Sequence, residues 1–449
     1  MKSKRAKVLH EAGGDTLLNQ VIRAALHVAT PEQIVAVVGH QAAQVRESVK
    51  VPGIRFAEQT EQKGTGHAVL CARQSVASEN GDLLILNGDG PLLKASTLQA
   101  LLALHRTKRL GGAIVTTEAV DPTGYGRVIR NENGLVAAIV EQKSATPEQL
   151  KMHEINPGLY CFDAALFWQY IGEVTPNNAA KEYYITDMVE ILTRHGHPVA
   201  PLLVPDESEL LGINTRVELA FADKILRARK TSELMLSGVT IESPETVTID
   251  SHVEIGQDSI VEANVQLRGR TRIGANCRIG TGTVLKDCEI DDAVNILPYV
   301  VAEASAVRSG AIVGPFARLR LNAEAAEDSH VGNFVEMKKT RLGRGSKAHH
   351  LAYLGDATIG SKVNVGAGTI TCNYDGHKKS ATNISDNVFV GSNSTLVAPL
   401  TIAEGAFVAA GSVITKNVEQ DALAIARAHQ TEKAGWAKRR REVVVKRES

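Results

Sequence analysis

The sequence of 449 residues is poor in aromatic side chains, which make up 4% of it, so a core built from its 43% hydrophobic residues must be mainly aliphatic. It also lacks an excess of either charge, because 50 lysines and arginines balance 50 aspartates and glutamates. A protein that binds nucleic acid over its whole surface needs a basic surplus to neutralise phosphates, so this class is excluded. Local charged patches remain possible, and the length suits two or three domains.

Long apolar runs are missing as well. No segment approaches the roughly 18 apolar residues of a membrane span, and the polar start MKSKRAKVLH has no signal-peptide stretch, so we expect a cytoplasmic protein without a membrane partner. Cysteine is scarce, odd in number and without a CxxC pair, which favours buried or idle thiols over a disulfide framework or a zinc site. The five are Cys71, Cys161, Cys277, Cys288 and Cys372.

An aliphatic residue at every sixth position is the clearest positive feature. Neither a helix nor a simple strand selects one apolar position in six, whereas a parallel β-helix does, because each six-residue unit is a short strand plus a turn with one inward side chain. Its narrow interior leaves no room for rings. A sandwich of short strands is the alternative, but its turns should recur every 8 to about 12 residues. The two runs are Ile249, Ile255, Val261, Leu267, Ile273, Ile279, Leu285 and Ile384, Val390, Leu396, Ile402, Val408, Ile414.

The period is interrupted between these runs, at residues 314–356 and 369–383. Interruptions of a solenoid predict loops that leave one face, and loops on rigid scaffolds often carry function. Both stretches are therefore candidate functional segments.

The first part of the chain, residues 1–216, alternates strand-like and helix-like segments, which predicts an α/β domain with a Rossmann-like, mostly parallel sheet. Residues 217–237 contain one long helical pattern, a candidate connector, and residues 238–449 form the predicted β-helix domain. The basic tail KRRREVVVKRES is either a solvated terminus or a grip for an anionic ligand.

Asp89 follows the apolar run LLILNGDGPLL. Ligands of open α/β sheets bind at the carboxyl ends of strands, where an aspartate can hold Mg²⁺ beside phosphates. Asp-Gly also forms ordinary turns, so this motif alone leaves metal binding open. Upstream, the Gly-Thr-Gly turn at residues 64–66 allows backbone N–H groups to approach a ligand closely.

Further motifs follow in order: PTGYGRV, VEQKSAT, EINPGLY, EYYITD, EMKKTRLGRGSKAHHLAYLGDATIG and NVGAGTITCNYDG. With them the chain resembles, over nearly its whole length, the bacterial bifunctional N-acetylglucosamine-1-phosphate uridyltransferase/glucosamine-1-phosphate acetyltransferase family. The resemblance implies an α/β nucleotidyltransferase domain followed by a left-handed parallel β-helix. It implies acetyl transfer from acetyl-CoA to glucosamine-1-phosphate, then uridylyl transfer from UTP, which yields UDP-N-acetylglucosamine for peptidoglycan and lipopolysaccharide. It further implies Mg²⁺ and a homotrimer whose acetyl sites are shared between subunits.

For the nucleotidyltransferase site, the resemblance implies metal ligands, a phosphate contact, and contacts to uracil and to the sugar. From the residues alone, Gly126 and Asn156 could simply shape turns. The metal ligands are Asp89 and Asn214, of which Asn214 also belongs to the nucleotide-sugar site; the phosphate contact is Lys7; the uracil contacts are Gln59, Gly64 and Thr65; the sugar contacts are Gly126, Glu141 and Asn156.

For the acetyltransferase site, a base must take the proton of the amine, and a histidine titrates near neutrality. Of His349 and His350, the resemblance assigns the base to His350. The implied glucosamine-1-phosphate contacts are Arg320, Lys338, Tyr353, Asn364 and Lys379, and the implied acetyl-CoA contacts are Ala367, Asn373, Tyr374, Ser392, Ala410 and Arg427.

One departure from the family pattern concerns the start, which lacks the family's first strand and glycine-rich loop. We expect a start codon assigned too late; if the chain truly starts here, it should be an acetyltransferase with weak or no uridyltransferase activity. Gly90 and Pro157 are smaller departures.

Other classes remain as alternatives. One is a sugar nucleotidyltransferase whose β-helix only oligomerises or regulates. Another is a non-enzymatic scaffold, or a metal-dependent β-helix, although the repeats offer no clear third partner for His349 and His350.

Overall fold

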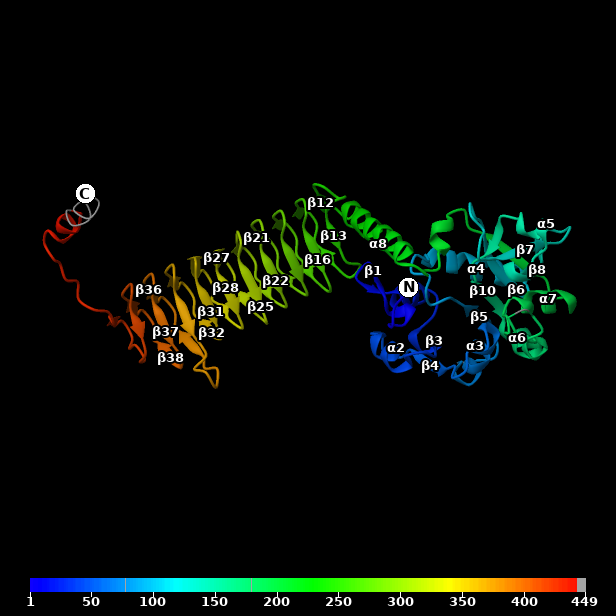
Figure 1. Cartoon of the computed structure of the whole chain (residues 1–449), viewed down its shortest axis with the longest axis horizontal. Coiled ribbons are helices and arrows are strands. Elements are labelled where there is room, and N and C mark those ends of the chain that lie inside the picture. The colour runs from blue at the N-terminus through cyan, green and yellow to red at the C-terminus, as the bar shows by residue number, and fades with distance from the viewer. Residues whose placement is uncertain (77, 179, 442–449) are drawn as a thin grey trace, which may run out of the picture. The chain divides into compact units, whose positions relative to one another are not determined.

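The computed structural model describes residues 1–76, 78–178 and 180–441, so residues 442–449 of the predicted basic tail lie outside the described residues. The chain forms two compact units, residues 1–230 and residues 231 onward, and the division falls inside helix α8 (Arg216–Leu236) (Figure 1). Within the described residues no helix combines the length and the apolar character that a bilayer crossing requires.

The first unit contains a seven-stranded sheet. Strands β6 and β11 pair in parallel, whereas the other pairs in this sheet are antiparallel. The α/β class is confirmed, but the expectation of a mostly parallel sheet is wrong here. The turn Asn131–Gly134 shows the reason for one pair, because a connection this short can join β7 and β8 only as antiparallel neighbours. The strands are β5 (Asp82–Ile85), β6 (Gly112–Glu118), β7 (Gly126–Arg130), β8 (Val136–Val140), β9 (Glu154–Asn156), β10 (Tyr160–Asp163) and β11 (Val199–Leu203).

A parallel pair lies apart from that sheet. Strands β3 (Val35–Val38) and β4 (Arg55–Glu58) align residue by residue and are joined through helix α2 (Ala42–Ser48). This is the crossover connection that parallel strands require.

Helices cover both faces of the seven-stranded sheet. Successive side chains of a strand point to opposite faces, so alternate residues of one strand pack against different helices. On β6, Ile114 packs with α6 (Ala164–Tyr170) and α7 (Asp187–Arg194), whereas Ala113 and Val115 pack with α4 (Ala95–Lys108). The remaining helices of this unit are α1 (Leu17–Ala25), α3 (Thr65–Ala72) and α5 (Pro147–Leu150).

The second unit is a parallel β-helix, visible in Figure 1 as stacked strands between β12 (Thr240–Ile241) and β38 (Leu400–Ile402). Its strands form three all-parallel sheets of 11, 10 and 9 strands, one on each side of the prism, consistent with the predicted left-handed β-helix. Every predicted inward aliphatic residue is buried except Ile255, which is partly buried against the same core.

The coils differ in length. Gln266 pairs with Val284, eighteen residues on, but Arg272 pairs with Glu289, only seventeen on. Such one-residue contractions account for the apparent interruption of the repeat at residues 314–356. Strands continue through this range without a break, so the prediction of a loop there is wrong. The second interruption is a real insertion, residues 373–381, between β34 (Ile370–Cys372) and β35 (Thr382–Ile384).

Aromatic rings lie on the outside of the prism. Tyr299, Phe316 and Phe334 occupy one corner of three successive coils, each with positive φ and about half exposed. Their rings stack at 5.2 Å and 5.4 Å between centroids. We call these three residues the aromatic ladder.

All five cysteines are free thiols; Cys161, Cys277 and Cys288 are buried.

Candidate active sites

Lys7, Asp89 and Asn214, from three distant parts of the first unit, meet at one point. The ammonium Nζ of Lys7 forms an ion pair with Oδ2 of Asp89 and donates to Oδ1 of Asn214 at 2.9 Å. The backbone N–H of Ile213 donates to the carbonyl of Asp89 at 3.0 Å, which fixes the two segments together. A carboxylate and an amide oxygen that converge on one cationic centre are the hard donors that Mg²⁺ prefers, so these residues fit the predicted metal.

Gln59 and Gly64 lie at the N-terminus of α3. The Nε2 amide group of Gln59 donates to the carbonyl of Gly64 at 3.1 Å and lies 3.0 Å from Nδ1 of His67. A carbonyl oxygen only accepts hydrogen bonds, so the Nε2 group of Gln59 faces the Gly64 carbonyl and Oε1 of Gln59 points away from that carbonyl. In this orientation Oε1 can accept a hydrogen bond from a ligand.

Tyr183 closes the other side of this turn. Gly64 has φ +104°, and a Cβ there would lie 2.6 Å from the Tyr183 carbonyl, so only glycine fits. The hydroxyl of Thr65 accepts the backbone N–H of Ile185 at 3.0 Å. The motif EYYITD therefore forms one wall of the predicted uracil site.

Gly126, Glu141 and Asn156 are also brought together. Gly126 pairs with Asn156 across β7 and β9, and a Cβ on Gly126 would lie 3.5 Å from a carboxylate oxygen of Glu141. Asn156 donates to the hydroxyl of Tyr160 at 2.7 Å, and the hydroxyl of Thr186 lies 3.4 Å from Oε1 of Glu141. Burial raises the pKa of Glu141 above its ordinary value. The Gly158 N–H also donates to Oδ1 of Asn156 at 3.2 Å, so the side chain of Asn156 is bonded at both ends within the EINPGLY segment.

In the second unit, His350 ends strand β30 (Lys347–His350) and is exposed. Its Nδ1 lies 2.6 Å from Oδ1 of Asn333, on the preceding coil. The ring of His349 meets His330 edge-on at 4.3 Å, and burial lowers the pKa of both. His350 is therefore the histidine of this group that faces solvent.

Arg320, Lys338 and Tyr353 lie on three successive coils of another sheet, on β25 (Arg318–Arg320), β28 (Glu336–Lys338) and β31 (Tyr353–Gly355). Both Nε and Nη2 of Arg320 lie 2.7 Å from Oε1 of Glu336. Lys379, from the inserted loop, lies against Lys338, and a side-chain hydrogen bond with Lys338, followed by the positive charge of Lys338, lowers the pKa of Lys379. Two ammonium groups held this close favour an anion between them.

The predicted acetyl-CoA contacts fall into two groups. Ala367, Ser392 and Ala410 occupy one corner of three successive coils, where backbone bonds of 2.7 and 2.8 Å link them through Asn393 and Gly411. The other group stands in or beside the inserted loop: Asn373 donates to the carboxylate of Asp356, and the exposed Tyr374 donates to the Gly376 carbonyl. Arg427, the last predicted acetyl-CoA contact, has its side chain beside Gly411.

Asn364, a predicted glucosamine-1-phosphate contact, pairs with Lys347 on the same sheet as His350.

His350 and Lys338 belong to different sheets of the prism. The predicted acetyl-site residues of one chain thus occupy two faces.

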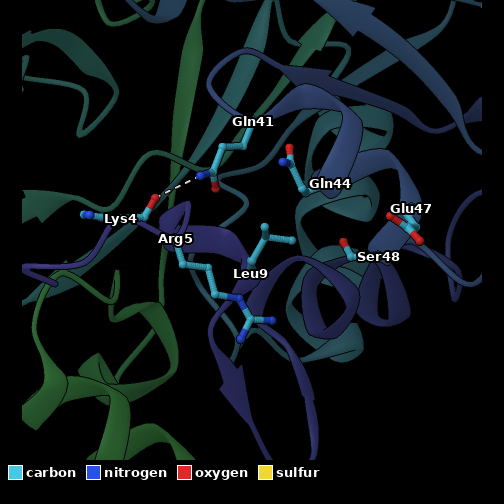
Figure 2. Close-up of a pocket in the computed structure, with 7 residues that line it drawn as sticks. All are labelled: Lys4, Arg5, Leu9, Gln41, Gln44, Glu47 and Ser48. Carbon is cyan, nitrogen blue, oxygen red and sulfur yellow. Dashed lines mark hydrogen bonds between the residues drawn. The ribbon is translucent and has the colours of Figure 1, made fainter.

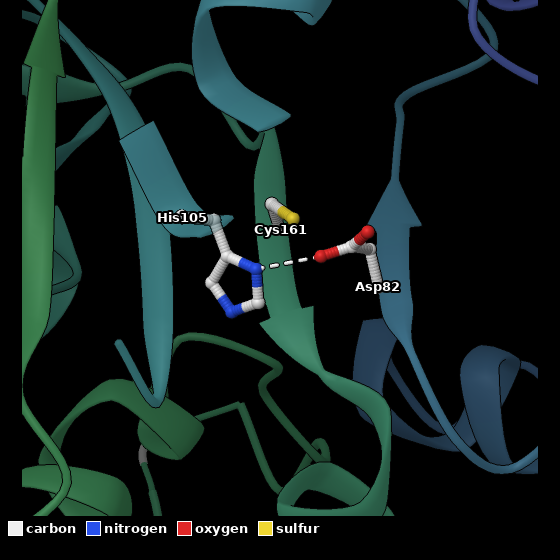
Figure 3. A group of neighbouring side chains, drawn as sticks. All are labelled: Asp82, His105 and Cys161. Atoms are coloured by element: carbon white, nitrogen blue, oxygen red, sulfur yellow. Dashed lines mark hydrogen bonds and ion pairs between the residues drawn. The ribbon is translucent and has the colours of Figure 1, made fainter. Parts of the chain in front are cut away.

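Asp82, His105 and Cys161 form a separate group (Figure 3). Nδ1 of His105 donates to one carboxylate oxygen of Asp82 at 2.8 Å, and Nε of Arg106 donates to the other at 2.7 Å. Burial raises the pKa of the Cys161 thiol to about 12, so it stays protonated and is a poor metal ligand near neutral pH. We interpret this group as a structural contact between β5, which carries Asp82, and α4, which carries His105 and Arg106.

An open pocket of about 480 Å³ lies between the start of the chain and α2 (Figure 2). Gln41 bridges it, donating to the Lys4 carbonyl at 2.9 Å and accepting from the Ala6 N–H at 2.7 Å. It contains no predicted site residue, but Gln41 fixes the segment that leads into Lys7.

Four residues that contact the predicted site residues were not themselves predicted: Asn333, His67, Tyr160 and Thr186. Three of them lay within quoted motifs or beside a predicted residue: Thr186 in EYYITD, Tyr160 in EINPGLY, and His67 directly after the Gly-Thr-Gly turn. Asn333 had no signal other than its place in an interrupted repeat.

The fold and these sites define a nucleotidyltransferase joined to a hexapeptide-repeat transferase. Residues 2–207 match the nucleotidyl transferase family, residues 252–287 match the bacterial transferase hexapeptide (six repeats), and residues 382–416 match the hexapeptide repeat of succinyl-transferase. The chain is 55% identical to Bifunctional protein GlmU of Solibacter usitatus, over 99% of this chain and 95% of the relative. The proteins of the same name from Koribacter versatilis and Streptococcus thermophilus are 48% and 44% identical, over 98% and 97% of this chain and 94% of each relative. The chain belongs to the GlmU family.

The predicted bifunctional enzyme of UDP-N-acetylglucosamine synthesis, with a nucleotidyltransferase and an acetyltransferase domain, is thereby confirmed. An enzyme with acetyltransferase activity alone is not favoured.

Proposed function

We propose that His350 is the base of the acetyl transfer. The amine of glucosamine-1-phosphate attacks the thioester carbonyl of acetyl-CoA, a C–N bond forms, the C–S bond breaks, and His350 takes the proton that the amine loses. The thiolate of CoA receives a proton in turn. Lys338 and Lys379 hold the sugar phosphate, which removes their mutual repulsion, and Arg320 adds a third cation.

For the uridylyl transfer, Lys7, Asp89 and Asn214 form the phosphate and metal site. Mg²⁺, when bound, neutralises charge that develops on the transferred phosphoryl group. The convergence of these three residues from distant parts of the chain is the observation that carries the proposal. Oε1 of Gln59 accepts from the N3–H of uracil, and Gly126, Glu141 and Asn156 contact the sugar.

The enzyme works as a homotrimer in the cytoplasm, where UTP and acetyl-CoA are available. Two features support the trimer: the aromatic ladder is exposed on an isolated chain, and His350 and Lys338 lie on different sheets of the prism. A neighbouring copy covers the ladder and completes the acetyl site from two chains.

Two variants test whether the sites are separate. His350→Ala should lower acetyl transfer by about 10² to 10⁴-fold, the usual worth of a positioned base, and leave uridylyl transfer unchanged. Asp89→Ala should abolish uridylyl transfer and spare acetyl transfer. Each activity is measured alone, with glucosamine-1-phosphate and acetyl-CoA or with N-acetylglucosamine-1-phosphate, UTP and Mg²⁺.

Matched controls are available in each unit. His349→Asn changes the neighbouring histidine, and Asp206→Ala removes a surface carboxylate that pairs with Lys94 at 3.0 Å. Both controls should keep both activities within a few-fold. Loss of both activities in either test variant would contradict two independent sites.

A further inference from the structure

Asn333 faces His350 because of the strand register. In the parallel pairing of β27 (His330–Asn333) with β30, Asn333 lies directly opposite His350, one coil away. Side chains at paired positions of parallel strands point to the same side of the sheet, about 5 Å apart. Their polar groups meet at 2.6 Å between Oδ1 and Nδ1.

The backbone holds this register tightly. A Cβ on Gly332 would lie 1.9 Å from the carbonyl oxygen of His349, so only glycine allows the two coils to approach so closely at this point. Asn333 and His350 directly follow Gly332 and His349 on the two strands, so they have little freedom to slide past one another.

We propose that Asn333 positions His350 for catalysis by accepting a hydrogen bond from its Nδ1–H. This rests on the proposed role of His350 as the base. With the proton fixed on Nδ1, the lone pair of the imidazole stands on Nε2, the nitrogen that points away from Asn333. Asn333 is thus a positioning residue, which touches no substrate and acts through His350.

The proton balance follows directly. Nε2 takes the proton of the attacking amine as the C–N bond forms, and the resulting imidazolium keeps its Nδ1–H on Oδ1 of Asn333. The imidazolium then returns the Nε2 proton to the departing CoA thiolate as the C–S bond breaks. A neutral amide orients the ring through both steps without the charge that a carboxylate would add.

The other ionisable groups around His350 are few. On its own strand stand Lys347 and His349, and on β27 stands His330. Burial lowers the pKa of His330 and His349, so both rings are neutral near pH 7, and Lys347 is the only cation among these groups. The next strand of the sheet, β33 (Asn364–Val365), presents the uncharged Asn364 beside Lys347. Among the residues that the structure describes, none of β27, β30 and β33 carries a carboxylate.

Two substitutions separate positioning from a merely structural role. Asn333→Ala removes the acceptor and should lower the kcat of acetyl transfer by about 10 to 100-fold, with the KM of both substrates within about two-fold. Asn333→Asp keeps an acceptor that can never donate to Nδ1. It should retain most of the activity at high pH, and its negative charge should move the acidic limb of the pH profile upward by about one pH unit.

A control variant lies on another sheet of the prism. Asn383→Ala removes an exposed asparagine from another sheet of the prism and should change neither kcat nor the pH profile. Thermal melting and acetyl-CoA binding show that each variant is folded.

If His350→Ala abolishes acetyl transfer but Asn333→Ala leaves kcat unchanged, the positioning role is wrong and the base assignment stands. Equal loss in Asn333→Ala and Asn333→Asp, with an unshifted pH profile, also overturns it. If His350→Ala itself retains activity, the proposed function fails.

Discussion

At the scale of single residues, Asp187 is a carboxylate whose surroundings oppose its charge. Burial, followed by the charges of Glu190 and Glu141, raises its pKa to about 6. Between about pH 4 and pH 6 the folded state holds a proton that the unfolded state has lost, so the free energy of unfolding falls as the pH rises through this window. Above it, the charged and half-buried Asp187 destabilises the fold.

Asp187→Asn should therefore stabilise the first unit at pH 8. The displaced pKa corresponds to at most about 3 kcal/mol, and solvent screening of a half-buried group reduces the expected gain to about 1 kcal/mol. Urea unfolding at several pH values between 4 and 8 measures it, and the gain should vanish near pH 4.

Asp206→Asn is the matched control of opposite sign. Hydrogen bonds from Ser208 and Lys94 lower the pKa of Asp206, so its charge stabilises the fold above pH 4 and this contribution disappears as the pH falls through its lowered pKa. Its replacement should cost stability at pH 8. A gain in both variants would show that the effect does not come from ionisation.

The site residues themselves could be named through the resemblance, but their contacts could not be predicted. Lys7 and Asn214 are 207 positions apart, and only the packing of the first unit brings them to Asp89. Asn333 and His67 were missed for the same reason. Each touches a predicted residue through a neighbouring coil or helix turn, and neither belongs to a pattern of charge or hydrophobicity.

At the scale of elements, the period of six correctly predicted which side chains fill the prism, because burial of one residue per short strand is a local rule. It did not predict the coils of seventeen residues, since the loss of one turn residue looks like an interruption of the pattern. The first unit was harder still. Alternating helices and strands indicate an α/β class, but whether strands pair in parallel depends on connections that hydrophobicity alone does not reveal.

The contact between β27 and β30 gives a prediction at this scale. Gly332→Ala places a Cβ against the backbone of His349, which cannot move aside as a flexible side chain would. We expect a loss of about 2 to 3 kcal/mol in stability of the β-helix unit and a strong loss of acetyl transfer. Denaturant unfolding and both activity assays measure the outcome.

Gly172→Ala serves as its control, because nothing lies within 4 Å of a Cβ there and no positive φ is involved. It should leave stability and both activities nearly unchanged. Unaltered acetyl transfer in Gly332→Ala would mean that the two coils can separate without disturbing His350.

At the scale of the whole molecule, the proposed trimer can be tested at the aromatic ladder. Phe316→Glu puts a charge in the middle of its stacked rings and should shift a trimer toward single chains, with loss of acetyl transfer and little effect on uridylyl transfer. Light scattering after size-exclusion chromatography measures the mass in solution. Glu254→Gln is the control, because Glu254 is exposed and lies on the nine-stranded sheet, whereas the ladder stands between strands of the other two sheets. A trimer that survives Phe316→Glu would place the interface elsewhere.

The left-handed backbone of this corner has a consequence for how the protein evolves. Phe316 at φ +54° occupies a conformation that costs most residues about 1 to 2 kcal/mol and that asparagine or glycine adopts more easily. A search for the most stable single chain would therefore replace the phenylalanine. In the proposed trimer the same ring contributes to the interface, so the best sequence for the monomer and the best sequence for the trimer would differ at this position.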